Sequence, residues 1–484
     1  MAKSVKKVML IGLDAPIAPR VYEYAKRGDL PHIKKLIEEG VYALNCLVPY
    51  PTITPPNWVT IVTGAWPGTH GITDFNVHIP GDPLDVTHQG FFKKDCKAEF
   101  LWEAAEKVGK KSIIVNYPTT WPPELKNGYQ LGGGGLSIDS YRLYKAVPGA
   151  YKISLADEQL FSIEELPLAT QVRFEEPRGW SNLPSSRKIK SVTLPLVYRR
   201  AKIPIKEKTW YALVTESESG ESAGVILCTK KDTNSAFANL KAGQWSSIIK
   251  QDFLTQEGIR QAAFRCKLLE CSIKDNKFKL YLTPICDLDG WSYPPELAKR
   301  ISSKEGLPLP RGGFNALTLG WIDTETLAEC IDYQNIWLAD ACVYLLENKE
   351  WDLFFMHAHC PDWAYHTFAN KLDPSLNPNK DEVAEYEKLE LEMYRSLDRM
   401  IGKIIEKASD ETLVIVVSDH GAKATTHHFD PVKLLIEAGL TVLKEDEMGR
   451  KVIDWERTKA VDQRSCYIYI NLKGRDQQGI VEPG

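Results

Sequence analysis

Side chains that could bind a metal follow short apolar runs at three distant places in this chain. Asp14 follows the run 8–13, Asp362 and His366 follow the run 353–356, and Asp419 and His420 follow the run 413–417. Carboxylate and imidazole groups are ligands for Zn²⁺ and similar divalent ions, so these residue types favour metal-assisted hydrolysis. Asp362 and His366 are four residues apart, and in a helix they would share one face and could chelate one ion. An ordinary polar pair on a helix is the alternative.

Thr54 is the candidate nucleophile. It precedes Pro55 and Pro56, and because proline favours the first helical turn, Thr54 is predicted at the N-cap of a helix. The dipole and free N–H groups of a helix N-terminus favour a bound phosphate. Metal coordination would activate the hydroxyl for attack on phosphorus, and the amide of Asn57, about one turn on, could donate to a phosphoryl oxygen. A threonine cap without chemistry is the alternative.

The elements that must position these residues follow from the apolar runs. Such runs are typical of buried parallel strands, and ligands bind beyond the carboxyl ends of these strands in open α/β sheets. Since Asp419 and His420 are neighbours, both reach one site only if the chain turns there, which Gly421 permits. We predict an α/β fold with a mostly parallel sheet sandwiched by helices. Helices are expected over 31–40, 100–108, 324–349 and 383–407, and another core strand over 111–116.

The middle of the chain has a different pattern of hydrophobic residues. Short strand-like runs replace helical patterns, and Asp275-Asn276 is a plausible hairpin turn between the last two. We predict a core formed by 1–150 and 306–484, with a β-rich insertion over 151–305 that caps the site. The insertion strands are expected at 189–195, 210–215, 225–229, 263–272 and 277–284.

Composition excludes several classes of function. The net charge is −4, with 60 basic and 64 acidic residues, which predicts no nucleic-acid surface. A basic cluster formed by the stretches 187–190 and 199–202 is interpreted as a solvated face, or else as a docking patch for an anionic substrate. No apolar stretch approaches the ~20 residues of a membrane span, and the apolar run after Lys7 is short for a signal peptide.

The ten cysteines include no Cys-x-x-Cys pair, so a cytoplasmic, reducing compartment is predicted.

A serine hydrolase was weighed against these features. Residues 220–224 match G-x-S-x-G, but that motif needs a strand, a sharp turn and a helix. Here it leads into a strand-like run, so a serine hydrolase is disfavoured. The oligomeric state is not predicted.

Taken together, the ordered motifs resemble the alkaline phosphatase superfamily, and within it the type I phosphodiesterase/nucleotide pyrophosphatase family. The matching stretches are Ile11–Asp14, Thr54–Trp58, Val62–Gly64, His70–Ile72, Pro361–His366, Leu397–Asp398 and Ser418–Gly421. The resemblance covers roughly 1–130 and 320–430. It implies an alkaline-phosphatase-like core and a hydrolase of small-molecule phosphate esters, with nucleotides as one candidate substrate class.

The resemblance also implies a site with two divalent ions, Zn²⁺ or alternatively Mn²⁺, about 4 Å apart. One ion would take Asp14, Thr54, Asp419 and His420, and the other Asp362, His366 and one further histidine. Thr54 would form a phospho-enzyme that water hydrolyses, and Asn57 would hold a non-bridging oxygen. A phosphomonoesterase of the same superfamily and a catalytically impaired, metal-poor binding protein are the alternative functions.

The chain departs from the family pattern in two ways. Trp58 replaces the histidine that is common after the asparagine. The last metal histidine of the family usually comes much later in the chain, whereas here only His427 and His428 follow His420. His357 and His359 lie upstream, where strand alternation places them on one face. We predict that neither His427 nor His428 is the true ligand and that the chain ends before it, which would leave the second metal weakly held.

Overall fold

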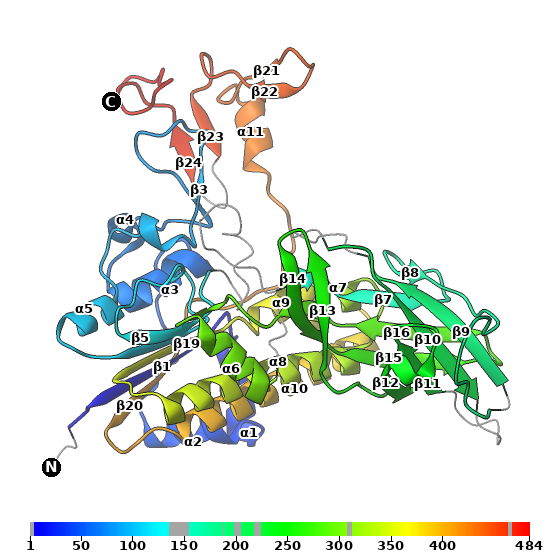
Figure 1. Ribbon diagram of the computed structural model, residues 1–484. Coiled ribbons are helices and arrows are strands. Elements are labelled where there is room, and N and C mark those ends of the chain that lie inside the picture. The colour runs from blue at the N-terminus through cyan, green and yellow to red at the C-terminus, as the bar shows by residue number, and fades with distance from the viewer. Residues whose placement is uncertain are drawn as a thin grey trace.

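The computed structural model of this protein describes residues 4–134, 154–186, 188–197, 205–216, 224–306, 312–462 and 467–484 (Figure 1). Most of the G-x-S-x-G match and most of the basic cluster therefore lie outside the described residues. The part that carries the predicted site residues is described in full.

A six-stranded sheet forms the centre of the molecule, with the strand order β18-β5-β4-β19-β1-β20. All neighbours are parallel except the short β18, which pairs antiparallel with β5 at one edge. The strands are β1 (Lys7–Leu13), β4 (Ser112–Val115), β5 (Gly128–Leu131), β18 (Ser292–Tyr293), β19 (Leu353–Ala358) and β20 (Thr412–Ser418). The predicted mostly parallel sheet is confirmed. β1 and β19 are largely buried, as their apolar runs predict. β20 is instead an edge strand, with Leu413 and Val416 exposed, so the prediction of a buried strand over 413–417 is wrong.

Alternation along β1 assigns its side chains to two separate hydrophobic clusters. Met9, Ile11 and Leu13 belong to a cluster with residues of α8 and α10, whereas Leu10 belongs to a cluster with residues of α3 and α5. Helices thus cover both faces of the sheet (Figure 1). The helices of this core are α1 (Ala18–Arg27), α2 (Pro31–Glu39), α3 (Thr54–Thr63), α4 (Pro67–His70), α5 (Leu101–Lys107), α6 (Glu296–Lys304), α7 (Phe314–Thr318), α8 (Thr324–Asn348), α9 (Asp362–Leu372) and α10 (Lys380–Ile405). A small hairpin of β2 (Asn76–Val77) and β3 (His88–Gln89) and the 3₁₀ turn η1 (Lys93–Asp95) complete it.

Between β5 and β18 the described chain is almost entirely β-structure. It forms three four-stranded sheets: β12-β11-β10-β9, β13-β14-β17-β6 and β15-β16-β7-β8. The elements are β6 (Ser154–Ala156), β7 (Gln159–Ser162), β8 (Thr170–Gln171), β9 (Lys188–Pro195), β10 (Thr209–Glu216), β11 (Gly224–Cys228), η2 (Thr233–Ser235), β12 (Ala236–Lys241), β13 (Ile249–Thr255), β14 (Gly258–Phe264), β15 (Cys266–Ser272), β16 (Lys277–Leu282) and β17 (Ile285–Asp287). We call residues 154–287 the β insertion.

The β insertion differs from the sequence expectation in two details. The single strand expected over 263–272 is two strands, because the chain leaves one sheet after Phe264 and enters another at Cys266. Residues 292–304, which the sequence analysis assigned to the insertion, pack with the core: β18 joins the central sheet, and Leu297 of α6 lies in the core cluster. The division of the chain into two units stays a prediction.

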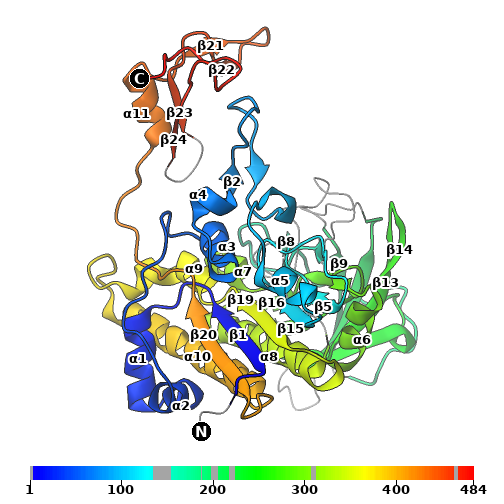
Figure 2. The same cartoon turned by 90° about the vertical axis from the view of Figure 1, so that its left-hand side faces the viewer.

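The C-terminal part of the described chain projects away from the central sheet (Figures 1 and 2). An irregular segment over 419–430 leads to α11 (Pro431–Glu437) and the short strands β21 (Leu443–Glu445), β22 (Lys451–Ile453), β23 (Ala460–Asp462) and β24 (Ile468–Ile470). Among the described residues, no helix has the length and apolar composition needed to cross a membrane.

Candidate metal centre

The site residues lie at the carboxyl ends of three adjacent strands. Leu13, the last residue of β1, is in register with Ala358 of β19 and Ser418 of β20. The residues that follow these strands are Asp14, His359 and Asp419. Parallel strands deliver their carboxyl ends to one edge, so segments that are distant in sequence meet there. The backbone N–H of Asp362, at the start of α9, donates to the Asp14 carbonyl at 3.1 Å, which fixes α9 beside β1.

α3 brings Thr54 to the same edge. Its Oγ1 lies 3.2 Å from Nε2 of His420. The helix begins at Thr54, and its N-cap is Ile53 rather than Thr54 as predicted. Pro55 and Pro56 have no N–H, so the first turn offers a phosphate fewer backbone donors than the sequence analysis expected. Thr54 therefore contributes its side-chain hydroxyl to the site, and the helix contributes mainly its dipole.

Two buried carboxylate oxygens without hydrogen-bond partners face His420. Oδ1 of Asp14 and Oδ2 of Asp419 lie 3.4 and 3.3 Å from its Nε2, and neither oxygen has a hydrogen-bond partner. Burial, followed by the nearby charge of Asp14, raises the pKa of Asp419 well above its ordinary value. Buried acceptors of this kind are costly unless they are paired, so a divalent cation held by Asp14, Thr54, Asp419 and His420 fits these residues.

The other oxygen of Asp14 is held by three nitrogen atoms. Oδ2 lies 3.1 Å from Trp58 Nε1, 2.8 Å from His357 Nε2 and 2.9 Å from His359 Nδ1. An ionised carboxylate only accepts hydrogen bonds, so all three nitrogens donate. Trp58 closes over β1 so tightly that a Cβ on Gly12 would lie 2.6 Å from its ring. These contacts orient Asp14 so that Oδ1 stays free for another partner.

The charges of this cluster are strongly coupled. Burial by itself would raise the pKa of Asp14, but the charge of His359 and the hydrogen bonds from both histidines lower it below its usual range. Burial, the largest single effect, would lower the pKa of His359, but the charges of Asp14 and Asp362 and the contacts with both carboxylates together raise it to about 9. Burial also lowers the pKa of His357. An ionised Asp14 therefore stands beside one charged and one neutral imidazole.

Asp362 and His366 lie on one face of α9, as their spacing predicts. His366 Nε2 lies 3.4 Å from Asp362 Oδ2, and the His366 side chain is 74% exposed. On the other side of Asp362, His359 Nε2 lies 3.1 Å from the same oxygen. Ligand atoms of Asp14, Asp362 and His420 also lie within 4.8 Å of one another, as do those of Asp14, His357 and His359.

A cavity of about 630 Å³ opens over these side chains. Its wall comes from the start of α3, from α9 and from the segment after β20, and no described residue of the β insertion lines it. The predicted capping role of the insertion therefore has no support from the cavity wall. The lining residues are Thr52, Ile53, Thr54, Phe75, His359, Asp362, Trp363, Tyr365, His366, Thr367, Ala369, Asn370, His420, Gly421, Ala422, Lys423 and Thr425.

Five predicted site residues do not line this cavity: the buried Asp14 and Asp419, together with His427, His428 and Asn57. His427 and His428 are exposed in the irregular segment that leads to α11, and neither lines the wall. Asn57 is buried one turn after Thr54, where its Nδ2 donates to the Pro51 carbonyl at 3.3 Å. A role for Asn57 in holding a phosphoryl oxygen would require release of that bond.

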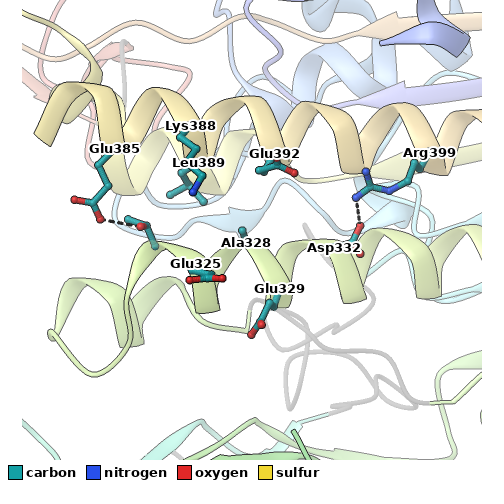
Figure 3. A pocket seen from close by; sticks show the side chains of 10 residues that line it. Glu325, Ala328, Glu329, Asp332, Glu385, Lys388, Leu389, Glu392 and Arg399 are labelled. Carbon is teal, nitrogen blue, oxygen red and sulfur yellow. Dashed lines mark hydrogen bonds and ion pairs between the residues drawn. The ribbon is translucent and has the colours of Figure 1, made fainter. Parts of the chain in front are cut away.

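A different cavity, of about 340 Å³, lies between α8 and α10 (Figure 3). Its charged side chains include pairs, such as Arg399 with Asp332 at 2.6 Å, and Thr324 donates to Glu385 at 2.7 Å. None of the predicted site residues lines it. The chemistry is concentrated at the strand ends.

Several contributors to the site were not assigned roles from the sequence. Trp58 was noted only as a departure from the family pattern, and Lys423 and Phe75 carried no motif. His357 and His359 were placed on one face by strand alternation, and both contact Asp14. That alternation was the only available signal, since sequence spacing does not give the distance from β19 to the end of β1.

Comparisons with known proteins identify partial relatives. The chain is 31% identical over 175 residues to human ectonucleotide pyrophosphatase/phosphodiesterase family member 1, an alignment that covers 35% of this chain and 18% of that protein. It is 31% identical over 105 residues to the bis(5'-adenosyl)-triphosphatase enpp4 of Mus musculus, covering 22% of this chain and 21% of that protein. The chain thus spans about a fifth of the length of these relatives.

A solved structure and a family profile complete the comparisons. A phosphonoacetate hydrolase from Sinorhizobium meliloti 1021, in complex with phosphonoformate, aligns over 92% of this chain and 65% of its own, with 14% identity and a TM-score of 0.37. The profile of the type I phosphodiesterase / nucleotide pyrophosphatase family matches residues 8–188 and 229–483. That match covers most of the chain, including every strand end that carries a site residue. The chain therefore belongs to the type I phosphodiesterase / nucleotide pyrophosphatase family.

Proposed function

We propose that this protein is a metal-dependent phosphodiesterase of the nucleotide pyrophosphatase type, with Thr54 as its nucleophile. One observation carries the proposal. The Thr54 hydroxyl and the His420 imidazole meet two carboxylate oxygens, from Asp14 and Asp419, at one end of the sheet. Neither oxygen has a hydrogen-bond partner in the described structure. A hydroxyl beside acceptors that suit a cation is the arrangement that an activated oxygen nucleophile requires.

The residues divide the reaction between them. The Thr54 hydroxyl gives up its proton to water, and Oγ1 attacks phosphorus. The bond from phosphorus to the leaving oxygen breaks as the phospho-threonine forms, and the leaving oxygen takes a proton from water. Water then cleaves the bond between phosphorus and Thr54 Oγ1, which releases the phosphate product and regenerates the Thr54 hydroxyl. Asp14, Asp419 and His420 would hold one divalent ion beside Thr54, and Asp362 and His366 would hold another beside the leaving oxygen. When bound, such ions supply Lewis-acid stabilisation of the charges that develop on the attacking and leaving oxygens.

The donor set supports the identity of the metals. Imidazole nitrogens combined with carboxylate oxygens suit Zn²⁺, and Mn²⁺ is the alternative for a site rich in oxygen ligands. We propose two Zn²⁺ ions. Because Asp14 and Asp419 are both buried, a bound cation would also relieve the repulsion between their charges.

The substrate is proposed to be a small phosphate diester, with a nucleotide as the favoured class. The two relatives are named as a nucleotide pyrophosphatase/phosphodiesterase and as a triphosphatase of bis-adenosyl compounds. The cavity wall carries the aromatic side chains Phe75 and Trp363 beside the site. A flat aromatic surface next to a cationic site fits a base attached to a phosphate.

One observation favours a phosphomonoesterase as a second candidate. Lys423 lines the cavity on the segment after β20, and a cation there could neutralise the additional charge of a terminal phosphate. Lys423→Ala separates the two functions. It should lower kcat/KM selectively for a monoester if the protein is a monoesterase, and change monoester and diester hydrolysis alike if it is not.

The test is a comparison of three substrates on metal-loaded protein. Bis-p-nitrophenyl phosphate, p-nitrophenyl phosphate and the p-nitrophenyl ester of a nucleoside monophosphate are hydrolysed by the wild type and by Lys423→Ala. The proposal predicts the highest kcat/KM for the nucleotide ester. A preference for the simple monoester would replace it with the second candidate, and the absence of turnover on all three would support a catalytically impaired binding protein.

We also propose that the protein works in the reducing environment of the cytoplasm. All nine cysteines in the described part of the chain are free thiols, and most of them are buried. Subcellular fractionation tests this proposal directly, and recovery of the protein only from an extracellular or lumenal fraction would contradict it.

A further inference from the structure

His359 has one ring nitrogen in use and one without a hydrogen-bond partner. Its Nδ1 lies 2.9 Å from the ionised Asp14 carboxylate and donates to it. Its Nε2 is buried and makes no hydrogen bond, although Asp362 Oδ2 is only 3.1 Å away. A ring nitrogen and a carboxylate oxygen at this separation are about as far apart as two ligands of one zinc ion.

The shared partner has a place in the cavity. His359, Asp362 and His366 all line the cavity, and Asp362 Oδ2 lies between the two imidazoles, 3.1 Å from one and 3.4 Å from the other. Histidines that bind metals almost always donate their other N–H to a carboxylate, which fixes the tautomer and the orientation of the ring. The bond from His359 to Asp14 is a contact of this kind.

The two ring nitrogens of His357 have contacts that differ from those of His359. Its Nε2 lies 2.8 Å from Asp14 Oδ2. Its Nδ1 lies 3.4 Å from Asn116 Nδ2, and the same amide donates to the His357 carbonyl at 3.0 Å. His357 is thus occupied on both sides of its ring and does not line the cavity. Of the two histidines at the end of β19, only His359 lines the cavity, with its Nε2 beside Asp362 Oδ2.

We infer that His359 is the third protein ligand of the metal held by Asp362 and His366. This inference rests on the proposed two-metal function and deepens it. The metal then has three protein ligands from one strand end and the first turns of the helix that follows it. Asp14 would couple the two metals, since it faces one of them through Oδ1 and supports a ligand of the other through Oδ2.

The test is a metal titration that does not depend on catalysis. Wild-type protein stripped with a chelator is titrated with Zn²⁺ by calorimetry and with Co²⁺ by visible absorption. His359→Asn is the informative variant, because its amide can keep the donor to Asp14 while removing the Nε2 ligand. His427→Ala and His428→Ala are the matched controls, since they remove the other candidates for the same role.

The wild type should bind two equivalents. In His359→Asn the affinity for one of them should fall roughly 100-fold or more, since the loss of supporting contacts alone costs 10- to 100-fold, and the other should be little changed. Both controls should keep two tight equivalents. If His359→Asn keeps both with wild-type affinity, or a control loses one instead, the inference is overturned. If wild type binds two metals but hydrolyses no ester, only the proposed function fails.

A second measurement covers the case in which His359→Asn does not fold. Extended X-ray absorption at the zinc edge, or a crystal structure of the Zn²⁺-loaded wild type, gives the ligands directly. The inference predicts His359 Nε2 about 2.1 Å from zinc. Two zinc ions bound with His359 outside the coordination sphere would contradict it.

Discussion

The end of the central sheet and the β insertion both bury charged groups, but they balance these charges differently. In the insertion the buried Asp287 is paired with Arg260, and the buried Lys267 is paired with Glu329. At the sheet end Asp14, Asp419 and His357 are fully buried within one cluster. In the insertion the buried cluster is made of apolar side chains, such as Trp210 and Phe264, whose rings stack with centroids 4.8 Å apart. All ten histidines of the chain lie outside residues 154–287.

The contrast separates two uses of burial. In the insertion, burial removes apolar surface from water and stabilises the fold. At the sheet end, burial strengthens electrostatic interactions and leaves acceptors that suit a cation. Damage to the insertion should therefore lower stability, and damage to the sheet end should lower metal binding and catalysis.

Removal of the nucleophile should have the largest effect. Thr54→Ala is expected to lower kcat for the preferred diester by at least about 1,000-fold, because the loss of a nucleophile abolishes the covalent route. Stability should change by less than about 1 kcal/mol, since Thr54 is not the N-cap. Thr63→Ala is the control, because that hydroxyl bonds only within α3 and to the segment after it. Near-wild-type turnover in Thr54→Ala would shift attention to Thr52, which also lines the cavity.

A cavity in the β insertion should affect stability alone. Phe264→Ala is expected to lower the free energy of unfolding by about 3–5 kcal/mol, because Phe264 is fully buried against Trp210. Metal content and kcat of the folded fraction should stay near wild type. Urea unfolding followed by tryptophan fluorescence, with metal analysis at zero urea, measures both. Loss of metal from the folded variant would show that the two regions are not separable.

Loss of the hydrogen bond from Trp58 to Asp14 should lower activity less than loss of the Thr54 hydroxyl. Trp58→Phe keeps an aromatic ring but removes the donor to Oδ2, and metal affinity and kcat/KM are expected to fall about 10- to 100-fold. Trp102→Phe lies in the same hydrophobic cluster without a contact to Asp14 in the described structure, so it should leave both quantities unchanged. Equal effects of the two variants would indicate that Trp58 acts only through packing.

Replacement of His70, a buried histidine away from the site, should have the smallest effect, which is on the pH dependence of stability. Burial lowers the pKa of His70 to about 4, so folded His70 stays neutral while the unfolded chain binds a proton below about pH 6.5. Stability is therefore full above pH 6.5 and decreases as the pH falls towards 4. Replacing His70 with Gln should reduce the loss between pH 7 and pH 5 by roughly 2 kcal/mol, measured by urea unfolding at both values. Parallel pH profiles for the two proteins would contradict this.

The sequence predicted the parts of the fold that depend on local patterns. The apolar run before Asp14 indicated a buried parallel strand, and the amphipathic spacing of α10 indicated a helix. The run before Asp419 indicated a parallel strand correctly but its burial wrongly, because β20 lies at the edge of the sheet. The break between β14 and β15 was not predicted, since both strands have the same composition and only the change of sheet separates them. The start of α3 was displaced by one residue, because a Thr-Pro-Pro sequence is compatible with threonine either as the N-cap or as the first helical residue.

The candidate site was predicted in its residue types but not in its distances. Asp14, Asp419 and His420 could be grouped because parallel strands share an edge. The contact of Thr54 with His420 depends on how α3 packs on the sheet, and the orientation of Asp14 depends on Trp58. The position of the His359 ring depends on contacts from different segments of the chain, and residue spacing in the sequence does not predict such contacts.

The most direct test of the central claim is to titrate metal-free wild-type protein with Zn²⁺ while recording bound metal and diester hydrolysis together. The account predicts that hydrolysis is absent in the stripped protein and reaches its maximum only as a second equivalent binds. Full hydrolysis in the stripped protein, or a maximum at one equivalent with no second binding event, would contradict it.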